Sequence, residues 1–144
     1  MVYGIASDHG GYELKAFIQR HFHVADLIDM GTDSLDRVDY PVYADRLCVA
    51  ILKKEVDGGL LICGTGIGVS MRANRYDGIR AALIYDDVTA NMAKAHNNAN
   101  VICLGGRTTD FSAVIPMITT WHTASFDGGR HTHRINQLDA PRVL

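Results

Sequence analysis

Five short apolar segments alternate with amphipathic segments along the chain. The apolar segments are residues 2–7, 24–29, 59–63, 79–84 and 100–104. Four of the five are almost continuously apolar, which is typical of strands buried on both faces of a parallel sheet. The intervening segments predict helices over about 12–22, 41–54, 67–75, 87–96 and 109–122. Strands that alternate with helices in this way indicate right-handed βαβ units.

The pattern therefore predicts an α/β fold, a three-layer α/β/α sandwich around a five-stranded parallel sheet. A length of 144 residues suits one domain, 1–144, with no room for a second. The order of the last strands is left open by the pattern. The segment after the last helix, from about residue 125, is polar and basic. A tail of this kind either packs against a neighbouring subunit or frays.

Composition excludes several classes of partner. With 14 Lys+Arg against 16 Asp+Glu, the net charge is −2 and no basic stripe is available for nucleic acid. No apolar run approaches the roughly 20 residues that cross a bilayer, so no membrane association is expected. The three cysteines, Cys48, Cys63 and Cys103, form no disulfide framework. An odd count suits a reducing compartment, and a cytoplasmic location is expected.

Polar residues follow the predicted strands at their carboxyl ends, where open parallel sheets bind their ligands. The loop 63–70 (CGTGIGVS) is the most informative of these segments. Its glycines let backbone amides turn toward an anion, with a helix N-terminus behind them. It lacks the third glycine of the dinucleotide fingerprint and the GK[ST] of a P-loop. A thiol at a helix N-terminus supports thiolate chemistry near neutral pH, which makes Cys63 a candidate catalyst. Cys48 and Cys103 are expected to be inert core thiols.

Three features in the second half of the chain need to be weighed between a structural and a functional interpretation. Arg130 and Arg134 would share a helix face and suit a phosphate, although a solvated basic face is the usual alternative. His131 and His133 form an HxH pair without a cysteine or carboxylate at ligand spacing, so no metal site is expected. His96 precedes a strand, which would normally place it at the opposite edge of the sheet from Cys63.

Six motifs in register resemble the type B ribose-5-phosphate isomerases, whose relatives act on galactose 6-phosphate and allose 6-phosphate. The motifs are SDHGG (7–11), DYP (39–41), DGGLLICGTGIGVS (57–70), HNNANV (96–101), GGR (105–107) and GGRH (128–131). The resemblance covers about residues 2–137. It implies a Rossmann-like α/β/α sandwich and a homodimer, sometimes paired into a tetramer. Such a protein interconverts ribose 5-phosphate and ribulose 5-phosphate without metal or cofactor. This reaction belongs to the non-oxidative branch of the pentose phosphate pathway.

The resemblance also implies a role for each matching residue. Cys63 would move a proton between C2 and C1 through a cis-enediolate, and Asp8 and His96 would open the furanose ring. The enediolate oxygen would be stabilised by Thr65 and by the loop that includes Gly64, Gly66, Ile67, Gly68 and Ser70. The phosphate would be held by His9, Arg107, Arg130 and Arg134, the last two from the partner subunit. The sugar hydroxyls would contact Tyr40 and Asn97.

Four further points concern the base, Arg72, the substrate and the class of protein. Some family members use a glutamate at the position of Val69 in place of the cysteine, and this chain resembles the cysteine users. Arg72 stands where the family usually has a small residue, and we expect it to be exposed or interfacial. The substrate could be a six-carbon sugar phosphate. A non-catalytic phosphate- or nucleotide-binding module is the competing class, but such a module would not need Cys63 together with Asp8 and His96.

Overall fold

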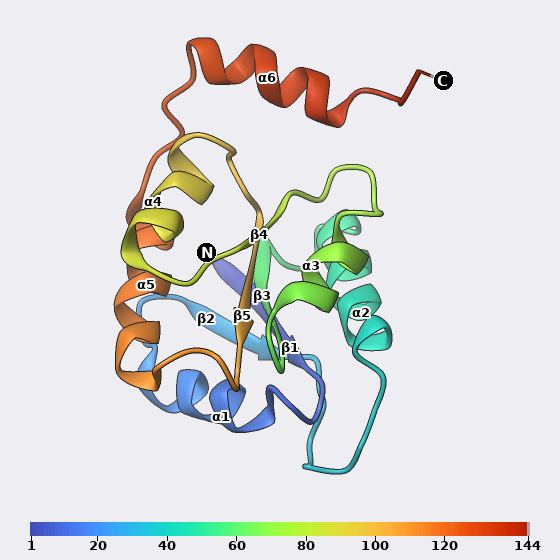
Figure 1. Cartoon of the computed structure of the whole chain (residues 1–144), viewed down its shortest axis with the longest axis vertical. Coiled ribbons are helices and arrows are strands. Elements are labelled where there is room, and N and C mark those ends of the chain that lie inside the picture. Colours follow the sequence, from blue (N-terminus) through green and yellow to red (C-terminus); the bar gives the residue numbers. More distant parts are fainter. Residues whose placement is uncertain (144) are drawn as a thin grey trace.

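Five parallel strands form one sheet at the centre of the chain (Figure 1). They are β1 (Val2–Ser7), β2 (Asp26–Asp29), β3 (Gly58–Cys63), β4 (Ala81–Leu83) and β5 (Val101–Gly105). The computed structural model describes residues 1–143, so Leu144, the last residue of the predicted domain, lies outside the described residues. The predicted strands are confirmed, although β2 begins two residues later than expected and β4 is shortened to three residues.

Helices cover both faces of the sheet, as predicted. One face packs against α1 (Tyr12–His21), α4 (Asp87–Ala95) and α5 (Phe111–Thr123). The other packs against α2 (Tyr40–Leu52) and α3 (Ile67–Ala73) (Figure 1). The α/β/α sandwich is therefore confirmed. No helix within residues 1–143 combines the length and the apolar character needed to span a membrane.

The strand order is β2-β1-β3-β5-β4, so the chain passes over the position of β5 and returns to it later. The outward move from β3 to β4 runs through α3 on one face. The return from β4 to β5 runs through α4 on the other face. Opposite faces are required because a right-handed crossover reverses its face when it reverses its direction. As a result β1, β3 and β5 are neighbours, with Ser7 opposite Ile62 and Cys63 opposite Gly105.

Cys48 and Cys103, which the sequence predicts to be inert, are completely buried in the hydrophobic core. Cys48 lies on α2 and Cys103 lies on β5. Burial raises the pKa of the Cys48 thiol to about 12. Burial also raises the pKa of the Cys103 thiol well above its ordinary value. Their complete burial confirms that they lie in the core, and their inertness stays a prediction.

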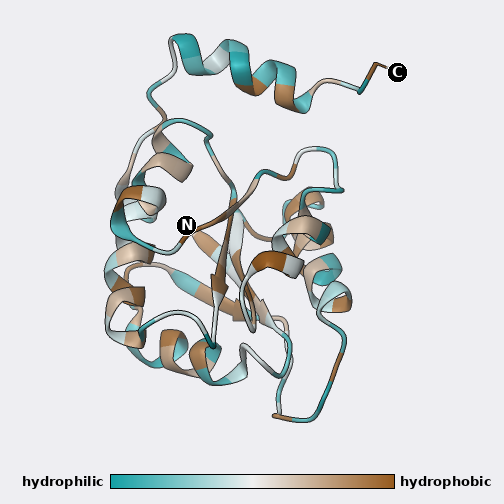
Figure 2. Ribbon diagram, in the orientation of Figure 1, coloured by the Kyte–Doolittle hydropathy of each residue, from teal (hydrophilic) through white to brown (hydrophobic). Residues whose placement is uncertain are grey.

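The sixth helix, α6 (Arg130–Asp139), stands apart from the sandwich (Figure 1). The hydrophobic pattern did not predict it as a separate element. Of its residues only His131 and Ile135 are buried. Figure 2 shows it mostly in the colour of hydrophilic residues, in contrast to the apolar strands. A largely polar helix that packs so little of its surface within its own chain is suited to bridging between domains or subunits.

An ion pair between a buried lysine and a partly exposed aspartate ties α1 to the end of β2. Lys15 is almost completely buried, and its Nζ donates a hydrogen bond to Asp29. Gln19 and the backbone N–H of Gly31 also donate to this carboxylate. Although burial raises the pKa of Asp29, these hydrogen bonds and the charge of Lys15 together lower it below its ordinary value.

We expect Asp29→Asn to lower the free energy of unfolding at pH 7 by about 1–3 kcal/mol, because the buried ammonium loses its counter-charge. A carboxylate whose pKa is depressed by folding stabilises the folded state above its unfolded pKa. That contribution is lost as pH falls through the folded-state pKa. The difference from the wild type should therefore shrink once the pH falls below the lowered pKa of Asp29. Urea unfolding at pH 7 and along a series of acidic pH values measures it, with Asp26→Asn, on the exposed start of β2, as the control. Equal stability of Asp29→Asn and wild type at pH 7 would contradict the prediction.

Candidate active site

Three loops meet at the carboxyl edge of the sheet, after β1, β3 and β5. The backbone N–H of Asp8 donates to the carbonyl of Ile62 at 3.2 Å. On the other side, the N–H groups of Gly106 and Arg107 donate to the carbonyls of Cys63 and Gly64 at 2.8 Å and 2.9 Å. These backbone bonds join the SDHGG, CGTGIG and GGR segments into one surface. The polar residues that the sequence placed at this edge are therefore neighbours in space.

Two glycines allow this close approach. A Cβ on Gly106 would lie 2.4 Å from the carbonyl oxygen of Gly10, so the loops after β1 and β5 contact each other backbone to backbone. Gly66 has φ +78°, and a Cβ there would lie 2.6 Å from Cδ1 of Leu83. A side chain at either position would push the loops apart or strain the turn. These glycines are therefore needed for the close packing of the loops at this edge of the sheet.

Cys63 is the last residue of β3 and is 5% exposed. Its Sγ accepts the backbone N–H of Gly66 at 3.1 Å. The helix α3 begins at the next residue, Ile67. A donated N–H and a helix N-terminus both stabilise negative charge on sulfur. The arrangement suits a thiolate that accepts a proton.

Asp8 and His9 begin the loop beside this thiol. Asp8 is buried, and its Oδ1 accepts the N–H of Gly11 at 3.1 Å. The Nδ1 of His9 accepts the N–H of Val38 at 3.2 Å. Because Nδ1 accepts, the neutral imidazole carries its proton on Nε2, which can then donate to an anion. Asp8 therefore accepts a hydrogen bond within its own loop, and His9 accepts one from the segment before α2.

Tyr40 and Arg107 flank the glycine-rich loop. Tyr40 opens α2, and a Cβ on Gly68 would lie 2.6 Å from Cζ of its ring. A Cβ on Gly64 would lie 3.4 Å from Nη1 of Arg107. The exposed guanidinium of Arg107 thus lies directly over the start of the loop. A phenol and a cation on either side of exposed amides suit a polar, anionic ligand.

The two hydroxyls of the loop hold its own backbone. Thr65 Oγ1 accepts the N–H of Ile67 at 3.2 Å. The Ser70 hydroxyl donates to the carbonyl of Ile67 at 2.7 Å. Both hydroxyls therefore fix the first turn of α3.

Four predicted site residues, His96, Asn97, Arg130 and Arg134, lie at the other end of the sheet. His96 follows α4 and precedes β5, and the arginines lie on α6, which Figure 1 shows beyond that same end. The six residues of β3 alone span about 16 Å. One chain therefore does not bring these four residues to Cys63.

His96 has neighbours that no sequence signal indicates. Its ring stacks on that of His131, with centroids 4.1 Å apart and planes 15° from parallel. Its Nε2 lies 3.9 Å from Oδ2 of Asp127. Burial, with the nearby charges of His96 and Arg130, lowers the pKa of His131. These pairings join the end of α4 to the segment after α5, residues too distant in sequence for spacing to connect them.

These three side chains are also the one group among the described residues that could hold a metal ion. The ligand atoms of His96, Asp127 and His131 lie within 4.8 Å of one another. Tetrahedral zinc with bonds of about 2.1 Å needs ligand atoms about 3.4 Å apart. Because the lone pairs of imidazole lie in the ring plane, stacked and nearly parallel rings keep them in two separate planes, which disfavours a common metal position. The arrangement is a poor fit to a metal, and the absence of a metal stays a prediction.

Arg72 is exposed, as expected. Its Nε and Nη2 donate to Oδ1 and Oδ2 of Asp45 on α2 at 2.7 Å and 2.9 Å. The hydroxyl of Tyr76 donates to the same carboxylate. The guanidinium is therefore held on the outside of α3 against α2.

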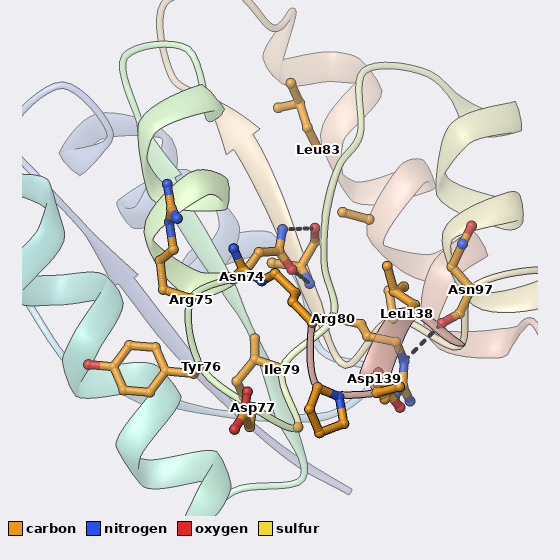
Figure 3. A pocket seen from close by; sticks show the side chains of 17 residues that line it. Asn74, Arg75, Tyr76, Asp77, Ile79, Arg80, Leu83, Asn97, Leu138 and Asp139 are labelled. Atoms are coloured by element: carbon orange, nitrogen blue, oxygen red, sulfur yellow. Dashed lines mark hydrogen bonds and ion pairs between the residues drawn. The ribbon is translucent and has the colours of Figure 1, made fainter. Parts of the chain in front are cut away.

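A groove of about 630 Å³ lies between α6 and the segment that leads into β4 (Figure 3). Asn97, Arg80 and Asp139 are among the residues that line it. It lies at the end of the sheet opposite Cys63. Nothing in the hydrophobic pattern singles out Arg80, whose neighbours come from distant segments.

Comparison with known proteins agrees with the fold and the motifs. The family described as Ribose/Galactose Isomerase matches residues 3–138. Ribose-5-phosphate isomerase B of Escherichia coli K12 is 39% identical over 135 residues, which cover 92% of this chain and 91% of that protein. A ribose 5-phosphate isomerase structure from Thermotoga maritima is 43% identical with a TM-score of 0.93, covering 96% of this chain and 97% of its own.

A second solved structure comes from Mycoplasma genitalium. It is a ribose-5-phosphate isomerase B with bound ribulose-5-phosphate, 39% identical, with a TM-score of 0.91, covering 96% of this chain and 93% of its own. Sequence and fold agree over nearly the whole chain in each case. The chain therefore belongs to the ribose/galactose isomerase family.

Proposed function

We propose that the chain is an aldose–ketose isomerase that interconverts D-ribose 5-phosphate and D-ribulose 5-phosphate. The observation that carries this proposal is the Cys63 thiol, which accepts the N–H of Gly66 at the start of α3. Membership of the isomerase family supports it, as does the relative that binds ribulose-5-phosphate. The place in the non-oxidative branch of the pentose phosphate pathway and the cytoplasmic location belong to the same proposal.

The isomerisation needs a base, an oxyanion stabiliser and no redox partner. The Cys63 thiolate removes the proton from C2 of the open-chain aldose, and the electron pair forms the C1–C2 double bond. Negative charge develops on O1, where the backbone amides of the 64–70 loop stabilise it. The proton on O2 moves to O1, and the thiol returns its proton to C1. The product is the C2 ketone, with every atom retained.

Ring opening precedes this step, because ribose 5-phosphate is mostly a furanose. A base must remove the proton from the C1 hydroxyl while an acid protonates the ring oxygen. Asp8 lies in the same surface as Cys63. In our proposal the second group, His96, comes from a second copy of the chain, because its own chain holds it at the far end of the sheet.

A two-fold dimer supplies the missing half of the site. In such a dimer every contact occurs twice, so an interface that brings α6 and the His96 loop of one copy to the partner's thiol completes both sites. The exposed arginines Arg130 and Arg134 and the polar surface of α6 support this arrangement. The segment from about residue 125 onward, which the sequence left as either packed or frayed, would then pack on the partner. Arg107 and His9 would complete the phosphate site from the first copy.

The direct test is conversion of ribose 5-phosphate in the presence of EDTA, followed by the appearance of the ketose. We expect turnover without added metal. Allose 6-phosphate and galactose 6-phosphate serve as competing substrates in the same assay. Preference for either would change the substrate within the same chemistry. No turnover of any of the three would overturn the proposal.

Removing the α6 arginines should weaken phosphate binding. We expect Arg130→Ala or Arg134→Ala to raise KM for ribose 5-phosphate by about 10- to 100-fold, because each deletes a charge-assisted contact to the phosphate. Inhibition by inorganic phosphate should weaken in parallel. Arg20→Ala, an exposed arginine at the end of α1, is the control and should leave KM unchanged. Unaltered phosphate inhibition in both α6 variants would count against their role.

A further inference from the structure

Arg80 lies at the start of β4 and binds two distant segments at once. Its side chain is 18% exposed. Nε donates to the carbonyl of Asn97 at 3.0 Å, and Nη2 donates to the carbonyl of Asn98 at 3.2 Å. Nη1 donates to Oδ2 of Asp139 at 2.6 Å (Figure 3). One guanidinium therefore joins the loop after α4 to the last residue of α6.

The loop after α4 has carbonyls that need this partner. The helix ends at Ala95, and Asn98 has φ +44°, which turns the chain out of the helix. Backbone N–H groups already bond the last carbonyls of α4, from Met92 to Ala95. The carbonyls of Asn97 and Asn98 lie beyond the helix, and Arg80 donates to both. A cation this close to a helix C-terminus is also favourable. Arg80 thereby fixes the loop that carries His96 and Asn97.

The backbone of Arg80 is held as firmly as its side chain. Its N–H donates to Oδ1 of Asn100 at 2.9 Å. The side chain of Asn100 also donates to the carbonyl of Gly78 at 2.8 Å. The guanidinium therefore projects from a segment that is bonded on both sides, and it cannot shift without disturbing the start of β5.

The other end of the guanidinium anchors α6. The pair with Asp139 is the one salt bridge within residues 1–143 that joins α6 to the rest of the chain. Near its start, α6 is held by the stack of His131 on His96. These two attachments are eight residues apart, about 12 Å along the helix. The first attachment is made by Arg80 itself, and the second is made by His96, which lies next to the carbonyls that Arg80 binds.

We propose that Arg80 is a positioning residue, which sets the placement of His96 and Asn97 relative to Arg130 and Arg134. These four residues form the half-site that one copy would present to the other, so the inference rests on the proposed function. Arg80 touches no reacting atom in this role. It keeps the ring-opening group and the phosphate-binding arginines at a fixed separation, which the reaction requires because misplacement by about 1 Å can cost about 100-fold in rate.

Substrate chemistry provides a test that separates positioning from general damage. Ribose 5-phosphate must open its ring before it reacts. Ribulose 5-phosphate has its carbonyl on C2, and closing a five-membered ring would need O5, which carries the phosphate. It is therefore open-chain already. Exchange of its C1 proton with solvent deuterium requires the enediolate step and no ring opening.

The experiment compares these two rates at saturating substrate for Arg80→Lys, which keeps the charge and loses the forked set of donors. We expect ribose 5-phosphate conversion to fall by about tenfold or more and C1 exchange from ribulose 5-phosphate by less than about threefold. Asp139→Asn releases α6 alone. It should raise KM for both sugars and leave both saturating rates near the wild-type values. Arg75→Lys, an exposed arginine of the same groove, is the matched control and should change neither rate.

His96→Ala, measured alongside, distinguishes failure of this inference from failure of the proposed function. If His96→Ala shows the unequal loss and a folded Arg80→Lys does not, Arg80 is not a positioning residue and the isomerase site stands. If His96→Ala lowers both rates equally, His96 does not open the ring, and the inference is overturned together with that role. Thermal unfolding shows whether Arg80→Lys folds. If it does not fold, Asp139→Asn tests the proposal instead. Unchanged KM values for both sugars in Asp139→Asn would overturn the anchoring of α6 by Arg80.

Discussion

Cys63→Ala is expected to lower kcat for ribose 5-phosphate conversion by about 10²- to 10⁴-fold, which is the range that a positioned general base contributes. The side chain removed is the one whose sulfur accepts the N–H of Gly66. Alanine leaves the loop backbone and its amides in place, so binding of the substrate should persist. Deuterium exchange at C1 of ribulose 5-phosphate should fall by a similar factor, because both reactions need the same base. The two rates are measured on the same preparation.

Cys48→Ala is the matched control for this variant. Cys48 is also buried and also a free thiol, but it lies in the core between α2 and the sheet. Its replacement should reduce stability and leave kcat near the wild-type value. Wild-type turnover by a folded Cys63→Ala protein would assign the base to another residue. An equal loss in both variants would indicate that the effect comes from disturbed packing.

Mixed dimers provide the second large effect, a recovery of activity from two inactive chains. Cys63→Ala and His96→Ala chains, co-expressed with different affinity tags and purified through both, form dimers with one copy of each. In a shared site, the thiol of the second chain meets the imidazole of the first, and one site of the two is intact. We expect about half of the wild-type activity per dimer, although each parent dimer has almost none.

The reciprocal pairing is the control and has the opposite expected outcome. A chain with both substitutions, paired with a wild-type chain, places one defect in each shared site, and activity should be nearly absent. If each chain instead held a complete site, this dimer would keep about half of its activity and the first pairing would have almost none. The two preparations together therefore discriminate between shared and separate sites.

The fold could be predicted from the sequence because the patterns that specify strands and helices are local. Near-continuous apolar strands and amphipathic helices predicted the α/β/α sandwich. The glycine-rich loop after β3 placed Cys63 correctly at the carboxyl edge, since a strand end and a helix start fix that position within a few residues. The least accurate strand was β4, which lies at the edge of the sheet and pairs with β5 alone. One neighbouring strand leaves its length weakly determined by the hydrophobic pattern.

The candidate site could be predicted only in part from the sequence. Motifs led to Asp8, His9, Tyr40 and Arg107, and the fold brings their loops together with that of Cys63. Side chains that contact each other from distant parts of the chain could not be predicted from their spacing in the sequence. Asp127 lies beside His96 and Arg80 beside Asp139, separated by 31 and 59 residues. Such contacts depend on where the strands and α6 come to lie.

By itself, the sequence determined the layers of the fold and the edge of the sheet to which Cys63 belongs, and it supplied the candidate site residues. These follow from hydrophobic period, turn residues and the direction of parallel strands, all of which act over a few residues. Only the tertiary structure decided the order β3-β5-β4, the departure of α6 from the sandwich, and the distance between the two halves of the proposed site. These depend on crossover handedness and on pairings across many residues, whose free energy exists only once the whole chain has folded.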